Sequence, residues 1–303
     1  TYYHPSNSYI YLYGNMDMEE KLAFLDEHYL SHFDYLDVDS VIQEQKAFGA
    51  CRDVTLEYPV AENEGEEDNT YLSYNTVIET ALDEKLYLAF DILDYTLLSA
   101  PGAPLKQALL DAGMGKDIMG SYEDGIYQPF FSIVAKNADP KKKDEFVALI
   151  RSTLEEIVKK GIDKKAILAG INYMEFRFRE ADYASYPKGL MYGLDVFDSW
   201  LYDDRHPFDY LCKLKVFDSL KEKAQTRYFE DLIKEYLLDN THASIVVVNP
   251  KRGLAAQRDK ALEEKLEAYK NSLSKEEVAK IVAESAHLKE YQDAPETPEA
   301  LAT

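Results

Sequence analysis

The alternation of hydrophobic and polar residues predicts a continuous series of elements over residues 105–180: one helix, a β-hairpin and two further helices. The first helix is short and amphipathic, and it ends at Gly113 and Gly115, since glycine commonly follows the last helical turn. The hairpin follows as two stretches rich in β-branched and aromatic residues. They are joined by residues 123–125, whose Asp-Gly pair favours the positive φ angles of a tight turn.

Two amphipathic helices are predicted after the hairpin. Asp139-Pro140 begins the first, because Asp caps free backbone amides and Pro at the first helical position loses no hydrogen bond. Gly161 ends that helix and Asp163 caps the next, so the connection is short enough to make the two helices antiparallel. Their apolar faces are Phe146, Leu149, Ile150, Leu154, Ile157 and Val158 on the first, and Ile167, Ile171, Met174 and Phe178 on the second.

This order of elements predicts the α+β class: a two-layer domain whose mainly antiparallel sheet is covered by helices on one face. Further strands are predicted over residues 8–13, 51–60, 70–80 and 243–249. Further helices are predicted over residues 83–100, 182–204, 208–220 and 224–238, the second of them interrupted by Pro187 and ending near Trp200. No Gly-rich phosphate loop follows any of these strands, so nucleotide chemistry has no support.

The pattern of a strand followed by a helix occurs twice, after residues 7–8 and again around residues 240–244. If each pair closes a domain, residues 1–45 are the terminal strand and helix of a preceding domain. Residues 46–250 then form a complete α+β domain, and residues 251–303 form a helical linker. The first residue is Thr rather than Met, so we expect the chain to begin inside a longer protein, with any targeting segment upstream.

Residues 258–292 carry two apolar stripes at helical spacing and are predicted to form two helices packed as a hairpin. The break lies near residues 271–274, where Ser274 and Glu277 have the spacing of a capping box. Because neither helix can bury its stripe alone, we expect the two stripes to face each other. The first stripe is Leu262, Leu266, Tyr269 and Leu273, and the second is Val278, Ile281, Val282 and Leu288.

Composition narrows the function classes. The chain has 303 residues, of which 46% are apolar, enough to fill a large core. Its 34 basic and 56 acidic residues give a net charge of −22, which argues against nucleic acid or an anionic membrane as a partner. No apolar run is long enough to span a bilayer.

The two cysteines, Cys51 and Cys212, lie outside any metal-binding pattern. We expect them to be buried or half-buried thiols in a reducing compartment such as the cytoplasm. A disulfide between them stays an open alternative.

Three stretches of the chain resemble one peptidase family. Residues 109–180, which begin LLDAGMGKDIMGSYEDGIYQPFFSIVAKNA, look like the second domain of insulinase/pitrilysin-type zinc metallopeptidases, in the branch of presequence protease and falcilysin. Residues 3–33 are similar to the strand and helix that close the first, catalytic domain of that branch. Residues 272–303 are similar to the helical linker between its two halves. The three stretches keep the family's order over nearly the whole chain.

The resemblance implies that zinc binding and the enclosure of the substrate belong to different domains. In this family two halves, each of two related α+β domains, close around an unstructured peptide, and the first domain holds zinc through an HxxEH motif and a later Glu. Neither HxxEH nor HExxH occurs in this sequence. The resemblance therefore implies that this segment is the metal-free second domain and hinge of a zinc metalloendopeptidase and is inactive by itself. Its implied partners are unstructured peptide substrates, the catalytic first domain and the C-terminal half of the same polypeptide.

No catalytic, cofactor-binding or metal-binding residue is expected within the segment. His28 and His32 have the i, i+4 spacing of zinc ligands, but no Glu lies between them and no third ligand is evident, so we interpret them as surface residues. No Ser or Cys lies in a nucleophile motif. The five carboxylates of residues 62–68 do not match the ligand positions of a calcium loop, and we interpret this stretch as a solvated, mobile loop.

Alternation in the strand after the hairpin predicts which face of the sheet meets peptides. The uniformly apolar set, expected beneath the helices, is Phe131, Ile133 and Ala135. The opposite set mixes polar and apolar side chains, as suits shallow contacts with peptides of many sequences. Within it, the residues expected to face the chamber are Gln128, Ser132 and Lys136. An open, solvated sheet face without a substrate role is an equally weighted alternative.

Two other function classes stay open. One is a non-catalytic scaffold, because a fold can persist after its metal ligands are lost. The other is an independent peptide-binding module, which 24 tyrosines and an acidic surface suited to basic partners would favour. An upstream sequence without HxxEH would select the scaffold, and measurable peptide binding by the isolated segment would favour the module over the chamber wall.

Overall fold

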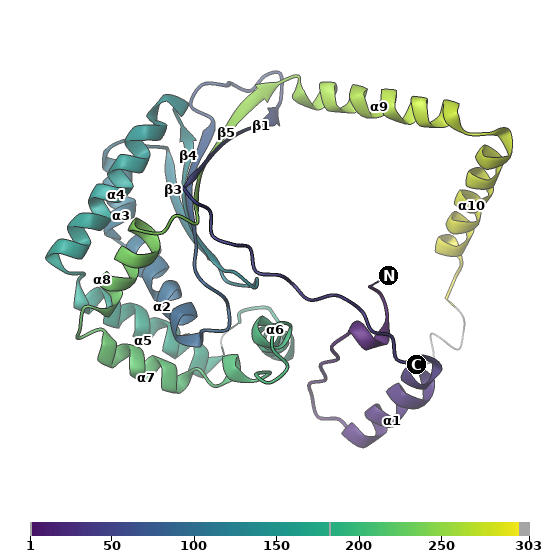
Figure 1. Ribbon diagram of the computed structural model, residues 1–303, viewed down its shortest axis with the longest axis horizontal. Helices are drawn as coiled ribbons and strands as arrows, with labels where there is room; N and C mark the ends of the chain where they lie inside the picture. The colour runs from purple at the N-terminus through teal and green to yellow at the C-terminus, as the bar shows by residue number, and fades with distance from the viewer. Residues whose placement is uncertain (1, 182, 297–303) are drawn as a thin grey trace. The chain divides into compact units, whose positions relative to one another are not determined.

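A computed structural model of the protein describes residues 2–181 and 183–296 (Figure 1). The chain divides into two compact units, which comprise residues 1–57 with 65–249 and residues 58–64 with 250–303. Within the described ranges, no helix is long and apolar enough to cross a membrane.

A five-stranded sheet is the frame of the fold. Its strands are β1 (Arg52–Val60), β2 (Thr70–Val77), β3 (Asp117–Glu123), β4 (Phe130–Ala138) and β5 (Ala243–Arg252). The strand order is β1-β5-β2-β4-β3, so β2 lies at the centre. β2 pairs antiparallel with β4 and β5, and β3 pairs antiparallel with β4. Together with the helices, this mainly antiparallel sheet confirms the predicted α+β class.

The hairpin between β3 and β4 is present, but its predicted tight turn is wrong. Residues 124–129 connect the strands, and Gly125 is not among the residues with a positive φ angle. The connection is fixed by the chain that follows β2, because Ile78 N donates to Pro129 O (2.7 Å) and Ala81 N donates to Tyr127 O (2.8 Å). These long-range hydrogen bonds override the local preference of the Asp-Gly pair.

Helices cover one face of the sheet (Figure 1). They are α2 (Glu84–Asp94), α3 (Pro104–Asp111), α4 (Lys143–Lys160), α5 (Lys164–Glu180), α7 (Leu214–Lys223) and α8 (Tyr228–Leu232). A π-helical turn extends α2 over Tyr95–Ser99 and α8 over Ile233–Leu238. Short 3₁₀ turns precede α4 at Pro140–Lys142 and α7 at Asp209–Leu211.

The predicted helix boundaries in this layer are largely confirmed. The side chain of Asp83 accepts a hydrogen bond at the start of α2, and Asp163 does the same at the start of α5. Asp139 caps the 3₁₀ turn that leads into α4. Gly113 and Gly161 follow α3 and α4 with φ angles of 62° and 90°, which only glycine adopts without strain. These termini depend on neighbouring residues alone, so the sequence pattern locates them.

The helices α4 and α5 are consecutive in the chain but pack mainly on different neighbours. α4 lies against α3 and the turn Ile233–Leu238, whereas α5 lies against α2 and α7. Although the connection at Gly161 is short, α4 and α5 do not pack mainly on each other. The two helices of an antiparallel pair would do so.

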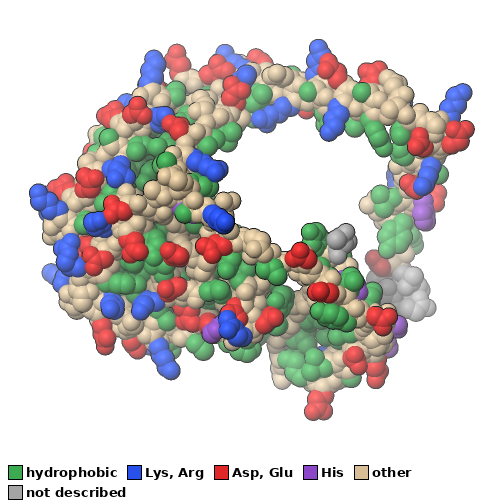
Figure 2. Space-filling model, in the orientation of Figure 1, with side chains coloured by type: hydrophobic (Ala, Val, Ile, Leu, Met, Phe, Trp, Pro, Cys, Tyr) green, Lys and Arg blue, Asp and Glu red, His purple; other side chains and the backbone are tan. Residues whose placement is uncertain are grey.

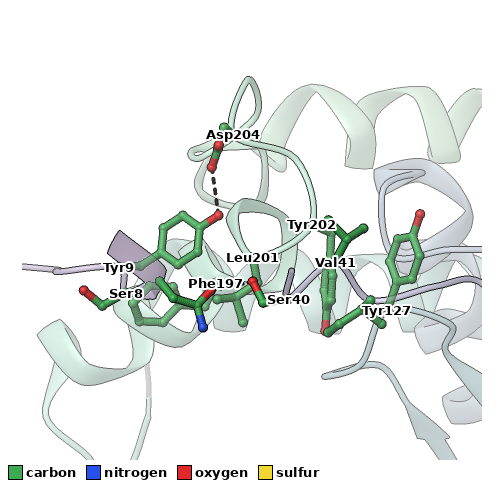
Figure 3. A pocket seen from close by; sticks show the side chains of 11 residues that line it. Ser8, Tyr9, Ser40, Val41, Tyr127, Phe197, Leu201, Tyr202 and Asp204 are labelled. Carbon is green, nitrogen blue, oxygen red and sulfur yellow. Dashed lines mark hydrogen bonds between the residues drawn. The ribbon is translucent and has the colours of Figure 1, made fainter. Parts of the chain in front are cut away.

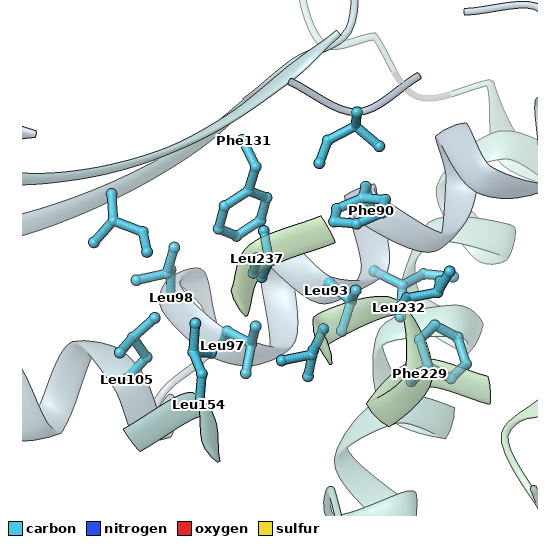
Figure 4. Close-up of a cluster of buried hydrophobic side chains, with 14 of the residues drawn as sticks. Phe90, Leu93, Leu97, Leu98, Leu105, Phe131, Leu154, Phe229, Leu232 and Leu237 are labelled. Carbon is cyan, nitrogen blue, oxygen red and sulfur yellow. The ribbon is translucent and has the colours of Figure 1, made fainter. Parts of the chain in front are cut away.

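The hydrophobic core lies between the sheet and the helices (Figure 4). Phe131, Ile133 and Ala135 are each at most 1% exposed and belong to this core, as predicted. The ring of Phe131 lies 6.1 Å from that of Phe90 on α2. The predicted apolar faces of α4 and α5 belong to the same cluster or pack against it. Because each large apolar side chain contributes about 1.5–3 kcal/mol on burial, this cluster determines which face of the sheet the helices cover.

Helix α6 (Lys188–Trp200) differs from its predicted boundaries. It begins directly after Pro187, and α5 ends at Ala181 in a left-handed conformation (φ 46°). The predicted helix therefore starts later than expected, whereas its predicted end near Trp200 is confirmed; Asp182 itself lies outside the described residues. Proline is favoured at a helix start, which explains why it begins this helix and does not interrupt it.

The N-terminal segment contains α1 (Met18–His28) between two 3₁₀ turns, Pro5–Asn7 and Leu30–His32. The strand predicted over residues 8–13 is wrong. This stretch is extended, but within the described ranges it belongs to no sheet and its backbone makes no hydrogen bond to a neighbouring strand. Its alternating tyrosines pack on a helix instead, as described below.

Two helices follow the sheet, α9 (Leu254–Ser272) and α10 (Lys275–Asp293), with the predicted break between them. The capping box is confirmed, because Glu277 N donates to Ser274 Oγ and Ser274 N donates to Glu277 Oε2. The predicted packing of the stripes is wrong. Leu262 and Leu266 are 54% exposed and Val282 is 63% exposed, so apolar side chains stand among charged ones along both helices (Figure 2). Each stripe is left uncovered by the other.

Candidate functional site

The face of the sheet away from the helices carries a polar row that crosses four strands. Ser132 on β4 is paired with Ser121 on β3 and with Asn75 on β2, and Asn75 is paired with Ser244 on β5. Paired residues point to the same face of a sheet. Some residues two positions along the strands are apolar, such as Val134 and Met119, whereas Ser73 and Glu123 at equivalent positions are polar. The row therefore offers hydroxyl and amide groups beside apolar neighbours.

Hydrogen bonds hold this polar row in place. Ser132 Oγ donates to Asn75 Oδ1 (2.6 Å), and Asn75 Nδ2 donates to Ser73 Oγ (3.1 Å). Ser121 Oγ donates to Glu123 Oε1 (2.8 Å). Ser132 lies on the predicted face, but it is only 6% exposed because its neighbours cover it. Contact between Ser132 and a peptide stays a prediction.

The other two predicted residues lie at opposite ends of β4. Gln128 precedes the strand and exchanges two hydrogen bonds with the backbone of Gln45: Gln45 N donates to its Oε1 (2.6 Å) and its Nε2 donates to Gln45 O (3.1 Å). Lys136 is half-buried and paired with Asp117 on the edge strand β3. Gln128 thus anchors the chain's own extended segment to the sheet, a role that alternation does not reveal.

A pocket of about 610 Å³ lies beside α6 in the same unit (Figure 3). The hydroxyl of Tyr9 donates to Asp204 Oδ1 (2.8 Å), and its ring lies edge-on against Trp200, with 4.7 Å between ring centroids. Its lining residues are Asn7, Ser8, Tyr9, Ser40, Val41, Ile42, Tyr127, Phe197, Leu201, Tyr202 and Asp204. The pocket combines aromatic walls with a few polar groups.

Two glycines of α6 leave room for the rings of two tyrosines of the N-terminal segment, Tyr11 and Tyr13. A Cβ on Gly193 would lie 2.9 Å from the ring of Tyr11, and one on Gly189 would lie 2.2 Å from the ring of Tyr13. Any side chain at either glycine would therefore displace a ring. The sequence signal for this contact is the pair of glycines four residues apart together with alternating tyrosines, and the sequence analysis missed it by assigning the tyrosines to a strand.

A group of carboxylates is enclosed by α2, α6 and α7. Tyr87 donates its hydroxyl to Asp198 Oδ2 (3.2 Å), and Lys213 Nζ donates to Asp195 Oδ1 (3.1 Å). Burial, with the charge of Asp124 adding to it, raises the pKa of Asp91 to about 8 and that of Asp198 to about 7. The group links three helices through polar contacts, and no nucleophile motif accompanies it.

The candidate metal ligands do not form a centre. His28 is the last residue of α1, whereas His32 lies in the following 3₁₀ turn, so the helical spacing that would align two imidazoles is interrupted. Across residues 2–181 and 183–296, no three His, Cys, Asp or Glu side chains are arranged to hold a metal ion. Cys51 and Cys212 are free thiols, and both are exposed, so the expectation of buried or half-buried thiols is wrong.

Comparison with known proteins identifies the family. The model of the peptidase M16 inactive domain matches residues 1–174, more than half of the chain, and the chain belongs to the M16 family of insulinase/pitrilysin-type peptidases. A second model, the peptidase M16C associated region, matches residues 248–303. Together they place the chain in the presequence-protease branch and identify it as the inactive domain followed by the associated region, which confirms the resemblance.

Two relatives illustrate this similarity. Protein HypA of Clostridium perfringens is 44% identical over 300 residues, which cover 99% of this chain and 31% of that protein. Presequence protease 1, chloroplastic/mitochondrial, of Arabidopsis thaliana is 31% identical over 308 residues, which cover 99% of this chain and 28% of that protein. The chain thus spans about a third of the length of these relatives.

Solved structures share the fold at lower sequence identity. A mutant of the ferredoxin protease FusC in complex with Arabidopsis ferredoxin superposes with a TM-score of 0.55 and 16% identity, over 78% of this chain and 24% of that one. A protease from Helicobacter pylori superposes with a TM-score of 0.53 and 16% identity, over 78% of this chain and 54% of that one. These likenesses support the M16 type of fold.

Proposed function

We propose that this chain is the metal-free second domain and hinge of a zinc metalloendopeptidase that degrades unstructured peptides inside a closed chamber. The observation that carries the proposal is the match to the inactive M16 domain together with one sheet face that the helices leave uncovered. In this proposal zinc and the HxxEH motif belong to the catalytic first domain of the same polypeptide, outside this chain. Its proposed segments are the terminal segment of that domain, which contains α1 (1–45), the inactive domain (46–250) and the linker (251–303).

The uncovered face supports a role as a chamber wall. Its polar row lies beside apolar side chains such as Val134, so it offers hydrogen-bonding groups and apolar contact within a short distance. Because Ser132 donates to Asn75, these two side chains keep a hydrogen-bond partner when this face contacts an apolar peptide side chain. Such a surface suits shallow contacts with peptides of many sequences.

The C-terminal helices support the role of a hinge and linker. Apolar stripes on α9 and α10 are exposed in this chain, and such stripes need a covering partner. We propose that other parts of the same polypeptide cover them. The non-catalytic scaffold and the independent peptide-binding module are the alternative outcomes of the test below.

The test adds bulk to the uncovered face in the full polypeptide that carries this chain. Ser132→Trp, and Met119→Trp on the same face of β3, should slow cleavage of long peptides several-fold more than cleavage of short ones, because long peptides need more of the chamber wall. Met119 is 42% exposed, so the second variant adds bulk without displacing the core. The measurement is kcat/KM for peptides that share one cleavage site and differ in length.

The matched control is Ser152→Trp on the exposed side of α4, away from the sheet. It should leave both rates unchanged. Equal effects on long and short peptides in the two face variants, with unchanged thermal stability, would contradict the chamber-wall role. Absence of any cleavage by the full polypeptide would favour the binding module if peptide binding is retained, and the non-catalytic scaffold if it is not.

A further inference from the structure

Helix α6 presents two gaps on one side to the N-terminal segment, residues 8–13. Gly189 and Gly193 are four residues apart, so they lie on the same side of the helix, about one turn from each other. The rings of Tyr13 and Tyr11 occupy the space beside them. At Gly193 an added Cβ would lie 2.9 Å from two carbons of the Tyr11 ring, well inside the separation that carbon atoms prefer. The contact therefore needs glycine.

The spacing of the tyrosines matches that of the glycines. Four residues of a helix rise about 6 Å, and two residues of an extended chain span about 6.6 Å. The rings of Tyr11 and Tyr13 are stacked with 6.4 Å between their centroids, which fits both values. The higher-numbered tyrosine lies against the lower-numbered glycine, so the segment runs antiparallel to α6.

Aromatic contacts continue this match toward the end of α6. Tyr9, two residues before Tyr11, lies edge-on against Trp200 and donates its hydroxyl to Asp204 (Figure 3). The Tyr11 ring also lies edge-on to Phe197, with 6.3 Å between centroids. Because each ring has a second neighbour besides the glycine face, it cannot move away from α6 without losing aromatic contacts.

The contacts with α6 determine where the segment lies. Among the described residues, the backbone of residues 8–13 makes no backbone hydrogen bond, and Ile10, between two of the tyrosines, is 41% exposed. Glycine inside a helix is also disfavoured relative to alanine. Two glycines within the 13 residues of α6 therefore weaken the helix, and the ring contacts that they permit offset this loss.

We propose that α6 is the docking surface for the terminal segment of the catalytic domain, and that Gly189 and Gly193 are positioning residues for catalysis by that domain. This inference rests on the proposed function, in which residues 1–45 end the catalytic domain. Three rings held at matched spacing prevent the segment from sliding along α6 or turning about its own axis. The position of the catalytic domain relative to the chamber wall then depends on the two glycines.

The first measurement follows the docking itself. Trp200 is the single tryptophan of the 303-residue chain, so acrylamide quenching of its fluorescence reports whether Tyr9 still covers it. Gly193→Ala places a methyl group against the Tyr11 ring, and we expect the quenching constant to rise about twofold as the segment detaches. Alanine in place of glycine normally stabilises a helix, so helix propensity alone predicts no such rise.

The second measurement is kcat and KM of the full polypeptide that carries this chain, with one unstructured peptide as substrate. Gly193→Ala should lower kcat about tenfold, because a catalytic domain that is misplaced by a fraction of an ångström loses its alignment with the bound peptide. KM should stay unchanged, since the chamber wall is not altered. The thermal unfolding temperature should not fall, which separates a positioning effect from loss of the fold.

Tyr11→Ala completes a double-mutant cycle. It removes ring contacts and should itself increase quenching and lower kcat. Once the ring is absent, the methyl group of Gly193→Ala has no close contact left, so adding it to Tyr11→Ala should cause no further change. The matched control is Gly49→Ala in the same unit, because nothing lies within 4 Å of a Cβ added there. It should leave quenching and kcat unchanged.

Each contrary outcome has a distinct meaning. Unchanged quenching in Gly193→Ala would overturn the docking role. Increased quenching with unchanged kcat would overturn the positioning role and leave the chamber-wall proposal intact. A loss of kcat that is equally large in the Tyr11→Ala background, or that Gly49→Ala reproduces, would show that the effect does not act through the ring. Absence of cleavage by the unaltered polypeptide would contradict the proposed function, and the positioning role with it.

Discussion

Single residues in the helical layer show how burial determines whether a carboxyl group is ionised. Burial, together with the negative charges of Asp124 and Asp198, disfavours ionisation of the Asp91 carboxyl. Alternation along β4 located the buried set that contains Phe131. It could not locate the group that contains Asp91 and Asp198, because these residues are far apart in sequence and only the fold brings them together.

The substitution Asp91→Asn tests the effect of burial on the ionisation of Asp91. The folded-state pKa of Asp91, about 8, lies above its ordinary value of 3.8, so its neutral form stabilises the fold at low pH. That contribution is lost as pH rises through about 8, whereas Asn stays neutral. We compare the free energy of unfolding of Asp91→Asn with that of unaltered protein. As the pH rises from acidic to mildly alkaline, we expect this difference to shift in favour of the variant by about 1 kcal/mol or more.

Urea unfolding at a series of pH values measures this gain. Asp144→Asn is the control, because the side chain of Asp144 on α4 is 97% exposed and its substitution should show no such trend. A difference between Asp91→Asn and unaltered protein that does not change with pH would contradict the account.

Secondary-structure elements were predicted best where their ends depend on adjacent residues. Asp163, Gly161 and Ser274 act on backbone groups within a few positions, so their caps could be located from the sequence. The turn at Gly125 and the strand over residues 8–13 were predicted wrongly, because contacts with distant segments determine both. The stripes of α9 and α10 show that an amphipathic pattern predicts a helix but does not identify the surface that covers it.

The capping box of α10 gives a quantitative test. Ser274→Ala removes the acceptor for Glu277 N and should reduce the stability of the first turn of α10 by about 1 kcal/mol. Amide hydrogen exchange over residues 275–278 measures this change. The control is Ser285→Ala in the middle of the same helix, where alanine is favoured and protection should be kept or increased. Equal protection in both variants would show that the box contributes nothing.

The whole molecule combines an inactive M16 domain with an associated helical region, and it spans about a third of its relatives' length. The α+β class and the family followed from the order of elements and from resemblance. The identity of the proposed peptide substrates is encoded by no local pattern in this chain. Its proposed contribution is therefore a wall and a hinge for catalysis by another domain.

The central claim, that this domain takes no part in zinc chemistry itself, is tested most directly by elemental analysis of the purified 303-residue chain after dialysis, together with a peptide-cleavage assay. The account expects no stoichiometric zinc and no cleavage, because the HxxEH motif is missing and His28 and His32 do not lie on one helical turn. One tightly held zinc ion per chain, lost when His28 and His32 are both changed to Ala, would contradict it.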